Sequence, residues 1–113
     1  MSWWRKRSQT TNDRDPAPAL MGRYCAGDAD AFRELYALLA PVVLADLAGR
    51  GCDGEPAVRV LESAFLTLHR DRRFYVLDAD PRPWLLAIAR RHEAALAKQV
   101  APALAAQAQA VSA

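Results

Sequence analysis

The chain has 113 residues, of which 52% are hydrophobic and 25% charged, and its formal net charge at pH 7 is +2. This length allows one small domain, and the composition is that of a globular protein rather than a disordered one. The small net charge identifies no partner, because a nucleic-acid-binding protein can be nearly neutral overall and basic on one face only. Abundant Ala, Leu, Arg and Glu, without alternating β-branched runs, predict an all-α fold.

Residues 1–17 are polar and turn-prone, and we expect them to form a disordered N-terminal tail. Trp3 and Trp4 precede a basic run, but neither the apolar segment of a signal peptide nor a run long enough to cross a bilayer follows them. We therefore expect a cytoplasmic protein without a membrane partner.

Two helices are predicted after this tail. The first covers 19–26, has Leu20 and Tyr24 on one side, and ends at Gly27. Asp28 is a suitable N-cap for the second helix, because its carboxylate can accept hydrogen bonds from backbone amides two or three residues later.

The second helix has a regular apolar stripe, made of Phe32, Leu35, Tyr36, Leu39 and Val43. Pro41 removes one backbone donor from it, and we expect either a kink or a brief restart of the helix before 42–47. Glycines around Cys52 then predict a turn, and Pro56 suits the first turn of a third helix.

The third and fourth helices each show one apolar face. The faces consist of Val58, Leu61, Phe65 and Leu68 in the third helix, and of Trp84, Leu85, Ile88 and Ala89 in the fourth. The third helix should end near Arg70, and a loop should cover 71–81. The fourth helix should continue to about Val100 and end at Pro102. The prediction is a small bundle of about four helices over 18–100, followed by an alanine-rich tail over 101–113, for which a frayed helical extension is the alternative.

The loop between the third and fourth helices combines arginines with aromatic side chains, a mixture that suits phosphates and unstacked bases. The candidates for nucleic-acid contact are Arg72, Arg73, Phe74, Tyr75, Arg82, Arg90 and Arg91. We expect Tyr75 to be exposed and Trp84 to be buried. For Phe74, burial in the core is the alternative to contact with nucleic acid. Arg90 and Arg91 point about 100° apart on a helix, so at most one should face the loop's surface.

Three segments occur in an order that resembles region 2 of the extracytoplasmic-function sigma factors of the sigma-70 family: AGDADAFRELYALLAP at 26–41, SAFLTLHR at 63–70 and RPWLLAIARR at 82–91. The resemblance implies that the third helix and the end of the second dock on the clamp helices of the largest subunit of RNA polymerase. The residues for this contact would be Arg59, Glu62, Ser63 and Leu66. It also implies that the loop and the fourth helix open the promoter minus-ten element and hold a flipped base.

The chain departs from this family at several positions. Arg59 and Glu62 stand where members usually carry aspartate and glutamine, and Arg91 replaces an asparagine. Family members also have a second domain that reads the minus-35 element, whereas the resemblance here covers region 2 alone. The first hypothesis is a divergent stand-alone domain that acts in transcription initiation. The second is a protein-interaction module that binds an anti-sigma protein or another regulatory partner without sigma activity.

An enzyme is the least favoured class. The sequence offers no nucleophile with a base, no glycine-rich phosphate loop and no clustered metal ligands, so we expect no cofactor, metal or small-molecule substrate. Cys25 and Cys52 with His69 and His92 match no zinc spacing, and two free thiols are expected.

Overall fold

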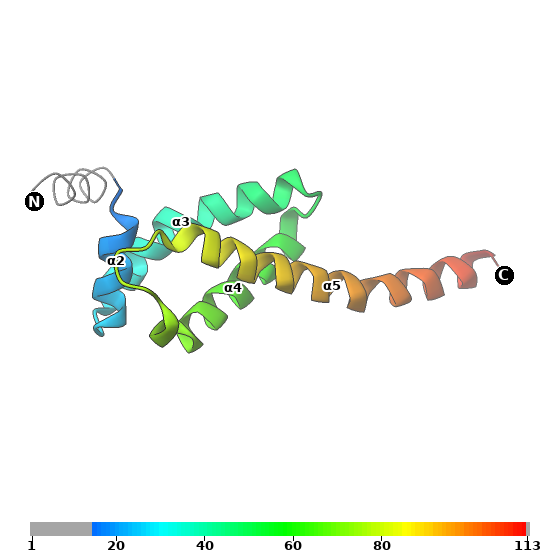
Figure 1. Ribbon diagram of the computed structural model, residues 1–113. Coiled ribbons are helices and arrows are strands. Elements are labelled where there is room, and N and C mark those ends of the chain that lie inside the picture. The colour runs from blue at the N-terminus through cyan, green and yellow to red at the C-terminus, as the bar shows by residue number, and fades with distance from the viewer. Residues whose placement is uncertain (1–14, 113) are drawn as a thin grey trace, which may run out of the picture.

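The computed structural model describes residues 15–112, which form four α-helices and one 3-10 helix, with no strand in that part of the chain (Figure 1). The elements are α2 (Ala17–Cys25), α3 (Ala29–Gly49), α4 (Gly54–Arg70), η1 (Arg72–Phe74) and α5 (Pro81–Ser112). The prediction of an all-α bundle of about four helices is confirmed. The Trp3 and Trp4 segment lies outside the described residues.

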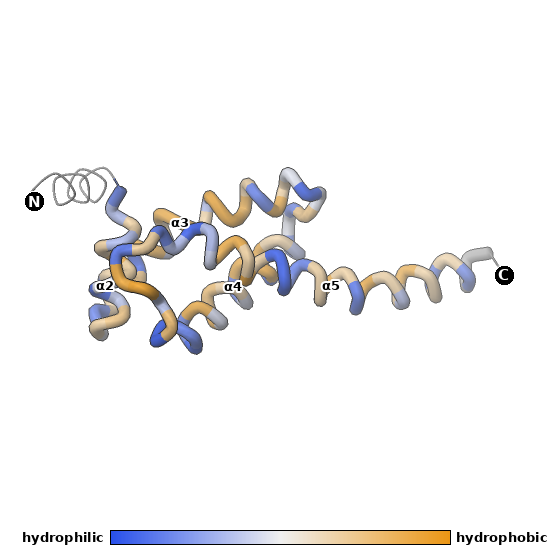
Figure 2. Tube along the Cα trace, in the orientation of Figure 1, coloured by the Kyte–Doolittle hydropathy of each residue, from blue (hydrophilic) through white to orange (hydrophobic). Residues whose placement is uncertain are grey.

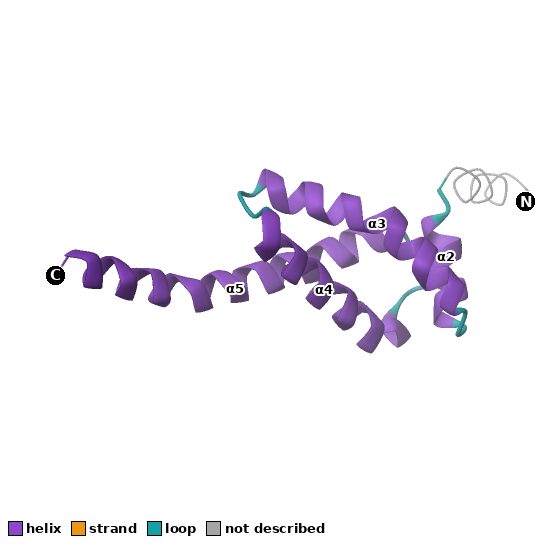
Figure 3. Ribbon diagram, turned by 180° about the vertical axis from the view of Figure 1, so that it is seen from behind, coloured by secondary structure: helices purple, strands orange, loops and turns teal. Residues whose placement is uncertain are grey.

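The turn between α2 and α3 forms as the sequence predicts. Gly27 has a φ of +100°, which glycine adopts without steric cost, and its amide donates to the carbonyl of Tyr24 as α2 ends. Asp28 caps α3, because its Oδ1 accepts from the amides of Asp30 at 3.0 Å and Ala31 at 3.2 Å. Short turns of this kind join the first three helices, and a longer segment leads from α4 to α5 (Figure 3).

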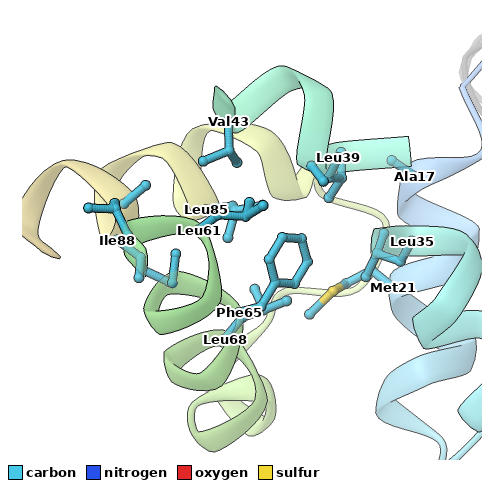
Figure 4. Packing of buried hydrophobic residues seen from close by; sticks show 14 of the residues in the cluster. Ala17, Met21, Leu35, Leu39, Val43, Leu61, Phe65, Leu68, Leu85 and Ile88 are labelled. Carbon is cyan, nitrogen blue, oxygen red and sulfur yellow. The ribbon is translucent and has the colours of Figure 1, made fainter. Parts of the chain in front are cut away.

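The core lies where α4 meets the other three helices. α4 packs chiefly against α5 and α2 against α3, while α3 also touches both α4 and α5. Figure 4 shows Phe65 of α4 pointing into the centre of the bundle, with side chains from every α-helix around it. The side chains labelled there are buried: Ala17, Met21, Leu35, Leu39, Val43, Leu61, Phe65, Leu68, Leu85 and Ile88.

Pro41 does not divide α3. The helix runs unbroken from Ala29 to Gly49, so the predicted restart before residue 42 is wrong. Pro41 is exposed, whereas Leu39 and Val43 on either side of it are buried. Packing on both sides of the proline offsets the loss of a single backbone hydrogen bond.

α5 continues past Pro102 to Ser112, so the prediction that this proline ends the helix is wrong. Alanine, which has the highest helix propensity, flanks Pro102 on both sides and favours continuation. The helix leaves the bundle near Leu96 and extends alone toward the C-terminus (Figure 1), with the side chains of 97–109 all exposed. This extension gives the molecule its 73 × 26 × 21 Å dimensions.

One predicted core position in α4 is wrong. Val58 is 43% exposed, and Ala57, Val60 and Ala64 lie in the core with the predicted Leu61 and Phe65. Because Val58 is three residues before Leu61, its spacing placed it on the apolar face, but it falls at the edge of that face and reaches solvent.

Among residues 15–112, each helix is too short or too polar to cross a lipid bilayer.

Two leucines of α4 test this arrangement, because Leu68 is fully buried and Leu66 is 72% exposed. We expect Leu68→Ala to lower the free energy of unfolding by about 2–5 kcal/mol, since the change removes buried methyl groups and leaves a cavity. The same substitution at Leu66 should change it by less than about 0.5 kcal/mol. Urea denaturation followed by circular dichroism measures both. Equal losses would contradict the assignment of the buried face of α4.

Candidate nucleic-acid interface

The outer face of α4 carries the four residues predicted to bind a protein partner. Arg59, Glu62, Ser63 and Leu66 follow one another at offsets of three, four and seven, so they form one strip on the helix surface. We call these four residues the α4 strip. Arg59 pairs with Glu55 one turn earlier at 3.8 Å, and both side chains are well exposed. An exposed pair of this kind adds little stability, so Arg59 stays available to a partner.

The α4 strip ends beside the loop that carries the predicted DNA-binding residues. In Figure 2 a hydrophilic turn at the end of α4 is followed by a hydrophobic stretch that leads toward α5. The turn contains Arg70, Arg72 and Arg73, and the stretch contains Val76 and Leu77. A partner bound along α4 would therefore lie directly next to the arginines.

Tyr75 is the more buried of the two aromatic residues of the loop. Tyr75 is half-buried, its ring stacks on that of Trp84 with centroids 6.3 Å apart, and its hydroxyl donates to the carbonyl of Ala79. Burial, with a smaller contribution from Asp78, raises the pKa of Tyr75 to about 12. The expected exposure of Tyr75 is wrong, because its ring covers Trp84, which is itself only partly buried.

Phe74 is the exposed aromatic residue of the loop. It is 65% exposed, so the alternative of burial is wrong for this side chain. The guanidinium carbon of Arg73 lies 4.9 Å from the centre of its ring, within the range of a cation–π contact. Val76 and Leu77 are also exposed, a feature that sequence periodicity does not reveal in a loop. The surface of the loop thus offers one aromatic face beside a cation, with aliphatic side chains next to it.

Arg72 is held by contacts across the bundle. Its Nη1 donates to the carbonyl of His69 at 2.6 Å, and its own carbonyl accepts from the thiol of Cys25 in α2 at 3.5 Å. His69 Nδ1 is hydrogen-bonded to the hydroxyl of Tyr24. These contacts fix the turn at the end of α4 against α2. No sequence pattern predicts that these four residues contact one another.

Two of the predicted arginines are engaged in ion pairs. Arg82 binds Asp15 at 2.7 Å and Asp80 at 3.1 Å, and its hydrogen bond lowers the pKa of Asp15. Arg90 binds Asp46 of α3 at 2.9 Å and lowers the pKa of that carboxyl through the same kind of bond. Their guanidinium groups are engaged in holding elements of the bundle together.

Arg91 points in a different direction from Arg90, as expected for adjacent residues of a helix. It lines a hollow of about 300 Å³ between α4 and α5, together with Arg70, Asp71 and neighbouring residues. The hydrogen bond from Arg70 lowers the pKa of Asp71, and the charges of Arg73 and Arg91 act in the same direction. Arg91 therefore borders the loop, whereas Arg90 does not. The structure brings together Arg72, Arg73 and Phe74, with Arg91 beside them.

Within residues 15–112 no three His, Cys, Asp or Glu side chains group closely enough to hold a metal ion, and both cysteines are free. The chain matches no protein-family model, no curated protein and no solved structure.

The Asp15–Arg82 pair generates a pH-dependent prediction. Because Arg82 lowers the pKa of folded Asp15, the pair stabilises the fold above the ordinary aspartate pKa of about 3.9, and this stabilisation is lost as pH falls through the lower, folded pKa. We expect Asp15→Asn to lower the free energy of unfolding by about 1 kcal/mol at pH 7 and to have no effect once the pH is low enough to protonate Asp15. Urea denaturation over a pH series measures this difference.

Asp53→Asn is the matched control, because Asp53 is exposed and has no ion pair within residues 15–112. It should leave the free energy of unfolding unchanged at every pH. An effect of Asp15→Asn that is constant with pH would contradict a role for its charge.

Proposed function

We propose that this chain is a divergent domain similar to sigma factor region 2 that takes part in transcription initiation. In this proposal it binds RNA polymerase core through the α4 strip and single-stranded minus-ten DNA through the following loop. The observation that supports it best is the exposed pair of Arg73 and Phe74 beside Arg72. The order of the family-like segments along the chain is the second support.

The loop has the chemistry that a single strand requires. An unstacked base needs a flat apolar face, and stacking on an aromatic side chain is worth about 1–3 kcal/mol per base. Phe74 offers such a face, while Arg72 and Arg73 supply charge for the adjacent phosphates. Neither arginine has a carboxylate partner among the described residues, so both charges are available to a ligand.

Polymerase binding by the α4 strip is supported by geometry rather than by charge. The strip is continuous, and Leu66 near its end is an exposed apolar side chain of the kind that anchors protein interfaces. Arg59 and Glu62 differ from the residues usual in the family, which changes the charge that the strip presents. A partner that accepts this strip must complement the changed charges.

A second candidate is a protein-interaction module without sigma activity, which would bind an anti-sigma protein or another regulatory partner. The exposed side chains of Leu66, Val76 and Leu77 favour it, because aliphatic groups contribute to protein interfaces and do not stack on bases. The replacement residues Arg59, Glu62 and Arg91 favour it too. Identification of the proteins captured from the native cell separates the two candidates.

The DNA-binding part of the proposal is tested with a fluorescent single-stranded oligonucleotide at low salt. We expect Arg72→Ala with Arg73→Ala to abolish binding, and Phe74→Ala to weaken it by about 1–3 kcal/mol through loss of stacking. Fluorescence anisotropy gives the dissociation constants.

Two controls match these changes. Arg33→Ala with Lys98→Ala removes the same net charge from exposed positions elsewhere, and Val76→Ala removes an exposed side chain of the same loop that cannot stack. Both should bind nearly as the unchanged chain does. Absence of any affinity in the unchanged chain would exclude DNA binding.

The polymerase-binding part is tested by a substitution in the α4 strip. We expect Leu66→Asp to prevent capture of RNA polymerase core, because the change replaces the one apolar side chain of the α4 strip with a charge that a partner would have to desolvate. Leu104→Asp in the extension of α5 is the control, since Leu104 is similarly exposed and distant from the strip. Capture of a different helical partner that Leu66→Asp abolishes, without any polymerase subunit, would favour the second candidate.

A further inference from the structure

A hollow of about 350 Å³ lies where the end of α2 meets the turn after α4. Its lining consists of Cys25, Arg70, Arg72 and Arg73. The volume is at the lower end of the range typical of ligand pockets, so a small group fits, with room for part of a larger molecule. Three arginines in the lining of one hollow predict an anionic ligand.

The charges of the hollow are only partly balanced within the described residues. Among residues 15–112 no carboxylate lines the hollow, and Asp71 beside it accepts two hydrogen bonds from Arg70 at 3.0 and 3.1 Å. Three positive groups against one negative group leave a formal charge of +2. Arg73 lies against the Phe74 ring, and Arg72 uses Nη1 alone for its bond to a backbone carbonyl, so most of their N–H donors are open to a ligand.

The wall of the hollow is held in place by contacts within the protein, before any ligand binds. The bond from Arg72 to the His69 carbonyl and the contact between His69 and Tyr24 attach the turn to α2. Cys25 completes the wall, with its thiol directed to the carbonyl of Arg72. Burial raises the pKa of the Cys25 thiol, so this group stays neutral near pH 7 and does not oppose an anion.

We propose that this hollow binds a phosphate group. A phosphate monoester carries close to two negative charges at neutral pH, which matches the +2 of the three arginines and Asp71, and guanidinium groups bind its oxygens by paired hydrogen bonds. The site goes beyond strand binding by the loop, because inorganic phosphate has neither a base nor a strand. Its extension to the phosphates of single-stranded DNA rests on the proposed function.

The two cysteines provide the experiment. Cys25 lines the hollow, while Cys52 is half-buried at the far end of the bundle between α3 and α4. The intact chain is alkylated with iodoacetamide, a neutral reagent, in phosphate or in chloride at equal ionic strength, and mass spectrometry gives the rate at each cysteine. At a phosphate concentration about ten times its dissociation constant, alkylation of Cys25 should slow roughly tenfold, because only about a tenth of the sites remain open. The rate at Cys52 should not change.

Variants identify the groups that hold the phosphate. Arg73→Gln and Arg70→Gln should each reduce the ratio of the chloride rate to the phosphate rate at Cys25, whereas Arg33→Gln, an exposed arginine of α3, should leave it unchanged. The ratio is taken within each variant, so a general change in thiol reactivity cancels. Equal slowing at both cysteines, or no slowing at Cys25, would overturn the proposal.

Oligothymidylates with a 5′-phosphate or a 5′-hydroxyl end then identify the source of the phosphate. Protection of Cys25 by both assigns the site to backbone diesters, and protection by the phosphorylated strand alone assigns it to a terminal monoester. A chain that shows phosphate protection but binds no oligonucleotide keeps this site and loses the proposed function. Oligonucleotide binding without protection of Cys25, in contrast, keeps the proposed function and overturns the phosphate site.

Discussion

Burial of one face of α4 is the constraint on which the other surfaces depend. Phe65 and Leu68 reach the centre of the bundle, where they meet side chains from the other three α-helices. Removing such side chains from water stabilises the fold by about 1.5–3 kcal/mol each. Because a helix that buries one side must present the other, the same packing exposes Leu66 and the rest of the α4 strip. The position of the arginine turn follows, since it begins where this helix ends.

The loop after α4 has an inner and an outer side. On the inner side Tyr75 covers Trp84 and binds a backbone carbonyl, and this contact secures the loop to the start of α5. On the outer side Phe74 is exposed next to Arg73. The two adjacent aromatic residues therefore have different roles. The ring of Tyr75 supports the loop, while the ring of Phe74 is available to a ligand. Preorganisation of this kind reduces the entropy lost when a ligand binds.

The helices and the turn between α2 and α3 were predictable from the sequence, because they depend on local chemistry, whereas the start of α2 at the buried Ala17, two residues earlier than expected, was not. The stripe of Leu35, Leu39 and Val43 repeats at helical spacing, and the Asp28 cap satisfies amides only two and three residues away. Pro102 was misread because propensity rules treat a proline as a helix end, whereas the alanines around it continue the helix.

The site was harder to predict because its contacts are distant in sequence. Arg82 binds Asp15, 67 positions away, and Arg90 binds Asp46, 44 positions away, so an arginine available to a ligand and an arginine engaged in the fold look alike in sequence. A loop also has no periodicity that would separate Phe74 from Tyr75. The hollow at Cys25 required the approach of α2 to the end of α4, which no local pattern encodes.

The solitary part of α5 has a kinetic consequence. An α-helix whose side chains are exposed is held mainly by its own backbone hydrogen bonds, and helices of this length without a packed face are marginal in water. Its amides should therefore exchange with deuterium far sooner than those near Leu85 and Ile88, whose opening requires the core to separate. A protease should likewise cut the end of α5 before the rest of the helix, because it cuts backbone that unfolds locally more readily than backbone that unfolds only with the whole domain.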